Sequence, residues 1–216
     1  HLLVATGRKP ALERLDLKAA GLRHGPNGVR VDDRLRTSNR RVLAIGDAAG
    51  QGQFTHLAGY HAGVVIRSML FGLPARVRTD HIPRVTYTQP ELAQIGLTEA
   101  EARKRHGDMV EVIRLGLDAN DRALAEGQTE GFIKLMVHRG RSVGVTIVGP
   151  GAGEMIAPWA LMIANRLKLS ALAGTVLPYP TQAELSKRAA GAYFSSRLFG
   201  NAWVKRVVGL VQRFLP

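Results

Sequence analysis

The sequence predicts an α+β fold, and three observations support this prediction. Five strand-like runs follow one another between residues 85 and 148 before helical patterns take over, which indicates an antiparallel sheet flanked by helices. Apolar residues recur with helical spacing from Phe54 to Phe71, and Gly72 and Pro74 follow in the order expected at a helix C-terminus. Before this helix, the apolar run Val42–Ile45 is typical of a strand buried on both faces.

The first part of the chain is expected to contain four short elements ahead of that helix. They are a strand-like run at Leu2–Ala5, a short peripheral helical segment within residues 12–22, a strand at Gly28–Asp32 and the buried strand at Val42–Ile45.

The second part carries stronger local signals. The expected strands are 85–88, 93–97, 110–117, 131–137 and 142–148. Thr98 followed by Glu101 matches a capping box and predicts a helix that ends near Gly107. Arg139-Gly140-Arg141 predicts a tight turn between two strands. A further helix is expected over 154–167, and Pro180 is expected in the first turn of another.

Composition narrows the classes of function. The chain has 216 residues, of which 45% are hydrophobic and 22% charged, so it can bury a core. It has no cysteine, which excludes disulfides and thiolate metal sites within it. The net charge of +13 could attract nucleic acid, but aromatic residues make up only 6% and no nucleic-acid-binding motif is present, so we expect none as a partner. No apolar stretch is long enough for a membrane span.

The pair Gly46-Asp47 is the most informative motif. Asp47 would lie at the carboxyl end of the expected strand, where ligands bind in open α/β sheets. A carboxylate there, followed by a turn of small residues and a helix, suits a ligand with sugar or ribityl hydroxyls and a nearby anionic group. The alternative is that Asp47 only caps a helix.

Two sets of motifs together resemble the flavoprotein pyridine nucleotide–disulfide oxidoreductases. The first set is Ala5-Thr6-Gly7-x-x-Pro10 with Gly46-Asp47, and the second is Thr88-x-Pro90-Glu91-x-Ala93-x-x-Gly96-Leu97-Thr98-Glu99 with Gly144-x-x-Ile147-Val148-Gly149 ahead of Glu154. The resemblance extends to about residue 190. It implies the end of a flavin-binding α/β domain, followed by an interface (dimerisation) domain with an antiparallel sheet flanked by helices.

The resemblance also implies a division of the chain. Residues 1–80 would form the C-terminal part of the nicotinamide/FAD-binding region, 81–200 the interface domain, and 201–216 an amphipathic C-terminal tail. Because the chain starts inside a strand-like run, we expect it to be a fragment of a longer protein.

The cofactor implied by the resemblance is FAD, with NAD(P)H bound by the upstream part. In the family, the aspartate corresponding to Asp47 accepts a hydrogen bond from the ribityl chain, and the N-terminus of the following helix faces the flavin ring. The candidate cofactor-binding residues are Thr6, Gly7, Gly46, Asp47, Thr55 and His56. His56 has the alternative role of a packing or capping residue.

The segment Pro178–Glu184 resembles a catalytic motif of the family. There a histidine acts as acid–base for dithiol–disulfide exchange, and a glutamate orients it. In this chain Tyr179 stands at the histidine position, whereas Pro180, Thr181 and Glu184 match. Tyrosine, with a pKa near 10, is a poor proton acceptor at neutral pH. Mercuric reductases also carry a tyrosine in this region but end in a cysteine pair, which is absent here. Tyr179 and Glu184 are the candidate catalytic residues, and the resemblance leaves the acceptor open.

The expected function is electron transfer from NAD(P)H through FAD to a disulfide, metal-ion or other small-molecule acceptor at a dimer interface. The resemblance implies a homodimer, for which we expect an apolar surface around Trp159 and Met162. The alternative is a non-enzymatic dimerisation or membrane-docking module.

The histidines and the tail complete the set of candidates. His24, His61, His81, His106 and His138 lack metal-ligand spacing, so we assign no metal site and no role to them. The amphipathic tail 202–214 either lies on an anionic membrane or covers its own protein or the dimer partner. The expected location is the cytoplasm, with the tail as a means of membrane association.

Overall fold

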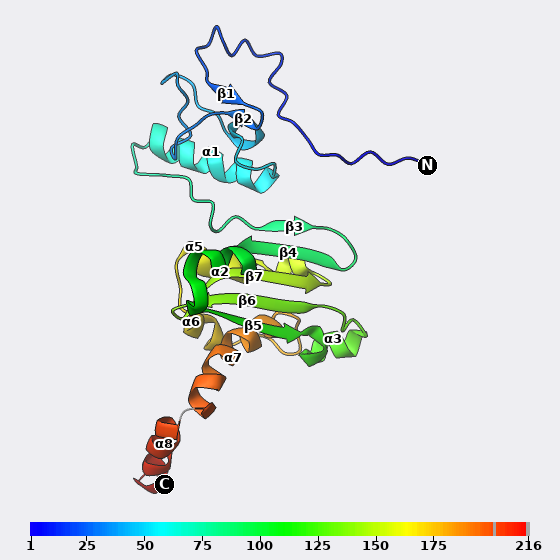
Figure 1. The fold of residues 1–216 in the computed structure, drawn as a ribbon, viewed down its shortest axis with the longest axis vertical. Coiled ribbons are helices and arrows are strands. Elements are labelled where there is room, and N and C mark those ends of the chain that lie inside the picture. The colour runs from blue at the N-terminus through cyan, green and yellow to red at the C-terminus, as the bar shows by residue number, and fades with distance from the viewer. Residues whose placement is uncertain (201, 215–216) are drawn as a thin grey trace. The chain divides into compact units, whose positions relative to one another are not determined.

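The computed structural model describes residues 1–200 and 202–214. The chain divides into two compact units, residues 1–78 and 79–216, each with its own hydrophobic core. Figure 1 shows the elements of both units.

The first unit is built around one long helix. α1, Thr55–Met69, is confirmed as predicted and buries Leu57, His61 and Val64. A ribbon of two short strands, β1 (His24–Gly25) and β2 (Gly28–Val29), and the 3₁₀ helix η1 (Gly46–Ala49) come before it. The core consists of Leu17, Val29, Leu35, Ala44, Ala49 and Val64.

Three predictions for the first unit are wrong. Val42–Ile45 is not a strand buried on both faces, because Ile45 is exposed and the run makes one isolated bridge, between Leu43 and Arg36. Leu2–Ala5 is exposed and has no regular structure, and residues 12–22 form turns. A strand needs a hydrogen-bonded neighbour along its length, and among the described residues Leu2–Ala5 has none. The expected strand 28–32 is reduced to β2.

The second unit contains a five-stranded antiparallel sheet in the order β3-β4-β7-β6-β5, seen in Figure 1 as a stack of arrows. The strands are β3 (Arg84–Thr86), β4 (Glu91–Gly96), β5 (Val110–Gly116), β6 (Phe132–His138) and β7 (Arg141–Gly149). All five were predicted. Arg139 and Gly140, which join β6 to β7, both have positive φ, as a two-residue hairpin turn requires.

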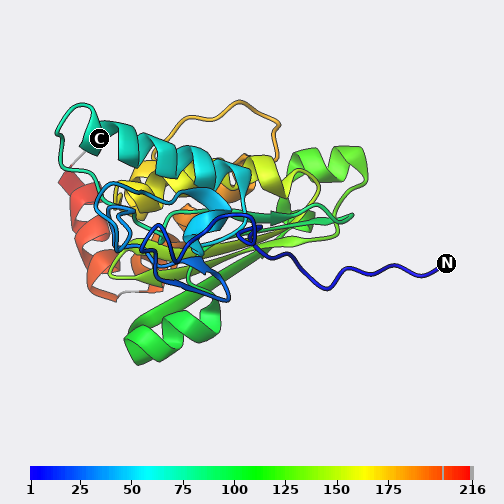
Figure 2. The same cartoon turned by 90° about the horizontal axis from the view of Figure 1, so that it is seen from above.

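Helices cover both faces of this sheet. α2, Glu99–His106, packs through Ala102 on Met136 and Val110. The opposite face, with Leu135 and Val145, packs against α4 (Ala152–Met155), α5 (Ala157–Ala164), α6 (Leu169–Ala173) and α7 (Glu184–Gly200). Figure 2 shows the sheet nearly edge-on, with the green α2 on one side and the yellow and orange helices on the other. The α+β prediction is confirmed.

The helix expected over 154–167 is divided between α4 and α5. Pro158 lies in the first turn of α5 and has no N–H to bond to the carbonyl of the preceding turn, so a new helix starts at Ala157. The sequence also gave no indication of α3, Asp121–Glu126, which Asn120 caps by accepting the N–H of Ala123 at 3.0 Å.

The core of the second unit corrects one expectation about dimerisation. Trp159 is fully buried and donates its indole N–H to Ser186 at 3.0 Å, and Met162 is 5% exposed. These two side chains therefore stabilise the unit and do not form an apolar surface. On the same helix Leu161 is exposed.

Pro180 does not lie in the first turn of a helix, where the sequence predicted it. Pro180 follows a cis peptide bond and lies outside a helix, and α7 begins at Glu184. α8, Ala202–Phe214, confirms that the tail is an amphipathic helix.

Candidate functional site

Gly46 starts the turn that carries Asp47, and its position is tightly constrained. Its φ is 58°, and a Cβ atom there would lie 2.9 Å from the Cβ atom of Ala58 in α1. Its N–H donates to Nδ1 of the buried His61 at 3.1 Å. Glycine is therefore required here, and the fixed backbone positions the neighbouring carboxylate.

Two glycines, Gly28 in β2 and Gly50 after η1, bring this turn against β2. A Cβ atom on Gly28 would lie 2.6 Å from the carbonyl oxygen of Ala48, and one on Gly50 would lie 2.8 Å from that of Asn27. The backbone of η1 is thus in direct contact with the β1–β2 ribbon, a contact that larger side chains would prevent.

A cavity of about 190 Å³ lies beside this turn and brings together two motifs far apart in the sequence. Its wall includes Asp47, Gly50 and Asn27, and also Arg8 from the first motif. The Arg8 guanidinium donates to the carbonyl oxygen of Gln53 at 2.6 Å, and the Gln53 amide donates to the carbonyl of Arg8 at 3.1 Å. The Asp47 carboxylate is exposed and has no hydrogen-bond partner among the described residues.

The other predicted cofactor residues lie outside this cavity. Thr6 and Gly7 are exposed in the extended first segment. Thr55 and His56 are exposed in the first turn of α1, where His56 stacks on Phe54 with ring centroids 5.2 Å apart. Phe54 occupies the N-cap position and makes no side-chain cap hydrogen bond to this turn.

The segment that carries Tyr179 and Glu184 is fixed by α3. The Asn120 amide donates to the carbonyl oxygen of Thr181 at 3.1 Å, and the Thr181 hydroxyl donates to the carbonyl of Pro178 at 2.9 Å. Sequence reasoning did not indicate this contact, because α3 has no strong apolar pattern and precedes the segment by some 60 positions.

The structure gives Tyr179 a partner other than Glu184. A hydrogen bond to Asp121, together with the negative charge of that residue, raises the pKa of the Tyr179 hydroxyl. Asp121 also forms an ion pair with Arg188 at 3.1 Å. Tyr179 is 68% exposed, and the nearby Glu184 carboxylate adds to the rise in pKa. These charges move the hydroxyl still further from acting as a proton acceptor at neutral pH.

One oxygen of the Glu184 carboxylate can still accept a hydrogen bond. Its Oε2 atom is buried and has no hydrogen-bond partner among the described residues. A buried carboxylate oxygen without a donor is costly and is found mainly where a further group is bound or transferred.

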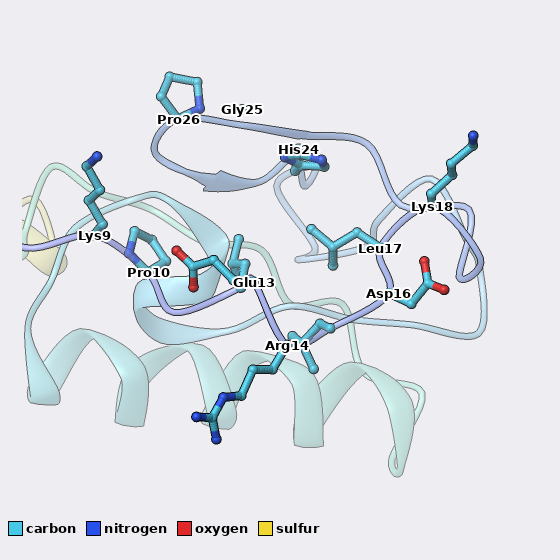
Figure 3. Close-up of a pocket in the computed structure, with 12 residues that line it drawn as sticks. Lys9, Pro10, Glu13, Arg14, Asp16, Leu17, Lys18, His24, Gly25 and Pro26 are labelled. Carbon is cyan, nitrogen blue, oxygen red and sulfur yellow. The ribbon is translucent and has the colours of Figure 1, made fainter.

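A cavity of about 630 Å³ beside the turns at residues 12–18 lacks such a convergence of groups, and charged residues of both signs line it. Figure 3 shows that Lys9, Arg14 and Lys18 point in different directions, away from a common centre. None of the predicted site residues lines it.

Two histidine environments were missed by the sequence analysis. His61 is fully buried in α1, and burial lowers its pKa. His106 and His138 stack with ring centroids 4.2 Å apart, although they are far apart in the sequence. No group of three or more metal-ligating side chains occurs within the described part of the chain.

Comparison with known families shows to which family the chain belongs. The sequence model of the pyridine nucleotide-disulphide oxidoreductase dimerisation domain matches residues 82–190, about half of the chain, and that of the pyridine nucleotide-disulphide oxidoreductase domain matches residues 1–62. The chain belongs to the pyridine nucleotide-disulphide oxidoreductases. This family depends on FAD and NAD(P)H. Residues 82–190 thus correspond to the dimerisation domain of this family.

The family's curated members include similar sequences. The chain is 36% identical over 186 residues to dihydrolipoyl dehydrogenase from Bacillus subtilis, covering 85% of this chain and 40% of that protein. It is 40% identical over 195 residues to mercuric reductase from Acidithiobacillus ferrooxidans, covering 89% of this chain and 35% of that protein. The chain therefore spans well under half the length of these relatives.

Solved structures of family members have the same fold. LpdA from Mycobacterium tuberculosis superimposes with a TM-score of 0.80 at 26% identity, covering 86% of this chain and 41% of that one. The HOCl-induced flavoprotein disulfide reductase RclA from Escherichia coli gives a TM-score of 0.77 at 27% identity, covering 87% of this chain and 44% of that one.

Proposed function

We propose that the chain forms part of a flavoprotein oxidoreductase that passes electrons from NAD(P)H through FAD to an acceptor at a dimer interface. The observation that carries the proposal is the cavity where Arg8 and the unpartnered Asp47 meet. Family membership and the similarity to dihydrolipoyl dehydrogenase and mercuric reductase support it.

The residues of the first unit fit part of FAD. Asp47 offers a free carboxylate to a ribityl hydroxyl, and the glycines around it let a ligand approach the backbone. Next to them the Gln51 amide oxygen is buried without a hydrogen-bond partner and can accept another hydrogen bond. Thr55 and His56 present the N–H groups of the α1 N-terminus, which stabilise negative charge. The chemistry that FAD supplies when bound is two-electron transfer between NAD(P)H and the acceptor.

The proposed domain division is 1–80, 81–200 and 201–216, with NAD(P)H bound by sequence outside this chain. The division of the structure after Arg78 and the family match over 82–190 support the first boundary. We place the protein in the cytoplasm, where NAD(P)H is available as reductant.

We propose that the electron acceptor is one whose reduction needs no side-chain base, such as a metal ion. A disulfide is the less favoured acceptor. A tyrosine hydroxyl is protonated at neutral pH, and Asp121 raises the pKa of Tyr179 further, so Tyr179 is a donor in the neutral pH range and not a general base. Its proposed catalytic role is to hold the acceptor, and the Glu184 carboxylate oxygen that lacks a partner can contact the acceptor as well.

The substitution Tyr179→His tests this proposal in the protein that carries this chain. The imidazole N–H can donate to Glu184 Oε2, which now lacks a partner, and the other ring nitrogen becomes a base. Because general acid–base catalysis contributes about 10²–10⁴-fold, turnover of a disulfide such as lipoamide should rise by up to that factor.

Two controls make the result interpretable. Tyr179→Phe removes the hydroxyl without adding a base and should leave disulfide turnover low, and Glu184→Gln should reduce the gain in the histidine variant. Lipoamide turnover by the unchanged protein that equals turnover by the histidine variant would refute the assignment.

A second proposal, carried by α8, is that the protein docks on an anionic membrane surface. On this helix Trp203, Leu210 and Phe214 are exposed on one face, and Lys205, Arg206 and Arg213 lie on the other. The helix has no acidic residue. An apolar face beside a cationic face is typical of helices that lie in a lipid interface. None of the described helices is long and apolar enough to cross a membrane.

Sedimentation with vesicles of phosphatidylserine tests this second proposal. A Trp203→Ala/Leu210→Ala/Phe214→Ala variant, which keeps every charge, should lose most vesicle binding, and binding by the unchanged protein should weaken as salt is raised. If instead the variant binds vesicles normally but shifts from dimer to monomer, α8 covers the dimer partner and the membrane proposal is wrong.

A further inference from the structure

A cavity of about 420 Å³ lies at one end of the five-stranded sheet. β3 and β7 begin there and β4 ends there, because neighbouring strands run antiparallel. α2, together with Ile163 of α5 and Arg166 beyond its C-terminal end, completes the wall. The proposed electron-transfer function uses none of the residues that line it.

Arginine dominates this wall. Four arginines contribute, each from a different element: Arg84 in β3, Arg105 in α2, Arg141 in β7 and Arg166 after α5. None of the four forms an ion pair with a described residue, whereas Arg103, on the same helix as Arg105, pairs with Glu99 at 2.9 Å. The sequence analysis considered the excess of basic residues only as a net charge, but the fold places four of them around one cavity.

The acidic residues of the wall do not balance these charges. Only Asp80 and Glu101 contribute carboxylates, so the lining carries two positive charges in excess. Glu101 is already engaged in the capping box, where its Oε2 accepts both the N–H and the hydroxyl of Thr98 at 2.8 Å. The Asp80 carboxylate lies 3.4 Å from Nδ1 of His81.

Two of the arginines are linked to each other. Nε of Arg141 donates to the carbonyl oxygen of Arg166 at 2.9 Å, and this leaves the terminal nitrogens of Arg141 available as donors. Arg166 adopts a positive φ of 53° as the chain leaves α5, and its N–H donates to the carbonyl of Ile163 at 3.1 Å. The contact between β7 and the end of α5 therefore fixes one side of the cavity.

His106 adds a further polar group to the wall. Partial burial, followed by the charges of His138, Arg105 and Arg139, lowers the pKa of His106. The imidazole is thus neutral at neutral pH and can donate one N–H without adding charge.

We infer that this cavity binds a small phosphorylated molecule with at least two negative charges, held by the guanidinium groups of Arg84, Arg105, Arg141 and Arg166. The planar guanidinium fork matches two oxygens of a phosphate group, and several such groups converge here. The volume lies within the range of small-molecule sites, and the charge excess corresponds to a doubly charged phosphoryl group.

Calorimetric titration of the chain with inorganic pyrophosphate, at constant ionic strength, tests the inference. Arg105→Gln and Arg166→Gln should each weaken binding by about tenfold, since each removes a charge-assisted hydrogen bond. The matched control is Arg103→Gln, which removes the same charge from the same helix at a side chain directed to Glu99. It should change the affinity by less than about twofold, because Arg103 does not line the cavity and its charge is paired with Glu99. Circular dichroism at increasing temperature shows whether each variant is folded.

Three results would overturn the inference. The first is the absence of pyrophosphate binding. The second is a loss of affinity in Arg103→Gln equal to the loss in Arg105→Gln. The third is vesicle binding that depends on Arg105, observed while pyrophosphate does not bind. The last result would assign the cavity to a lipid headgroup and not to a soluble ligand.

Discussion

At the scale of single residues, His61 connects the helix α1 to the turn that carries Asp47. Its Nδ1 atom accepts the N–H of Gly46, and its Nε2 atom is buried with no partner among the described residues. The ring must therefore stay neutral for the turn to keep its shape. His61 was not predicted, because a histidine within a helical pattern carries no signal of the tertiary contact it makes.

The buried imidazole predicts that acid destabilises the first unit. Burial lowers the pKa of His61 in the folded state below its unfolded value of about 6.5, so protons bind the unfolded state preferentially. The stabilising contribution is present above about pH 6.5 and is lost as pH falls through the folded pKa. His61→Gln, whose amide oxygen can still accept the Gly46 N–H, should remove this acid sensitivity in thermal unfolding.

Two further variants define the prediction for His61. His61→Ala leaves the Gly46 N–H unsatisfied and should cost about 1–3 kcal/mol at neutral pH. His24→Gln, at an exposed position of the same unit, should keep the acid sensitivity of the unchanged chain. An acid dependence that survives in His61→Gln would assign it to other groups.

At the scale of elements, prediction succeeded where the signals are local. Three signals depend only on residues close together in the sequence: the capping box at Thr98, the turn at Arg139-Gly140 and the apolar periodicity of α1. The elements that they predict therefore lie where expected. The strand at 42–45 failed because strands depend on neighbours that a local pattern does not contain. Pro158 was a local signal for the start of a second helix, and the prediction of one helix over 154–167 did not use it.

The cap of α2 gives a prediction at this scale. Thr98 accepts the N–H of Glu101, and Glu101 accepts the N–H of Thr98, so Thr98→Ala removes half of a reciprocal pair. We expect a loss of about 1 kcal/mol in the free energy of unfolding, measured by denaturant titration. Ser170→Ala, which removes an exposed hydroxyl with no hydrogen bond recorded in the described structure, should change it by less than about 0.5 kcal/mol. Equal effects of the two substitutions would show that the cap contributes nothing.

At the scale of the whole molecule, the family and the fold class could be predicted, whereas the pairing of distant groups could not. The motifs around Asp47 and Glu91 were sufficient to indicate the family, and the family models confirm it. The contact of Tyr179 with Asp121 and the four-arginine cavity depend on chain folding over long separations. The substitution of tyrosine for histidine is visible in the sequence, but the carboxylate that raises the pKa of this tyrosine is visible only in the structure.

The central claim is that the Asp47 carboxylate holds FAD, and flavin titration tests it most directly. In the protein that carries this chain, FAD binding followed by flavin fluorescence should weaken by about tenfold or more in Asp47→Ala, because a hydrogen bond to a charged group is lost. Glu13→Ala, which removes an exposed carboxylate of the same unit outside the cavity of Asp47, should bind FAD as the unchanged protein does. FAD affinity that is the same in Asp47→Ala as in the unchanged protein would contradict the account.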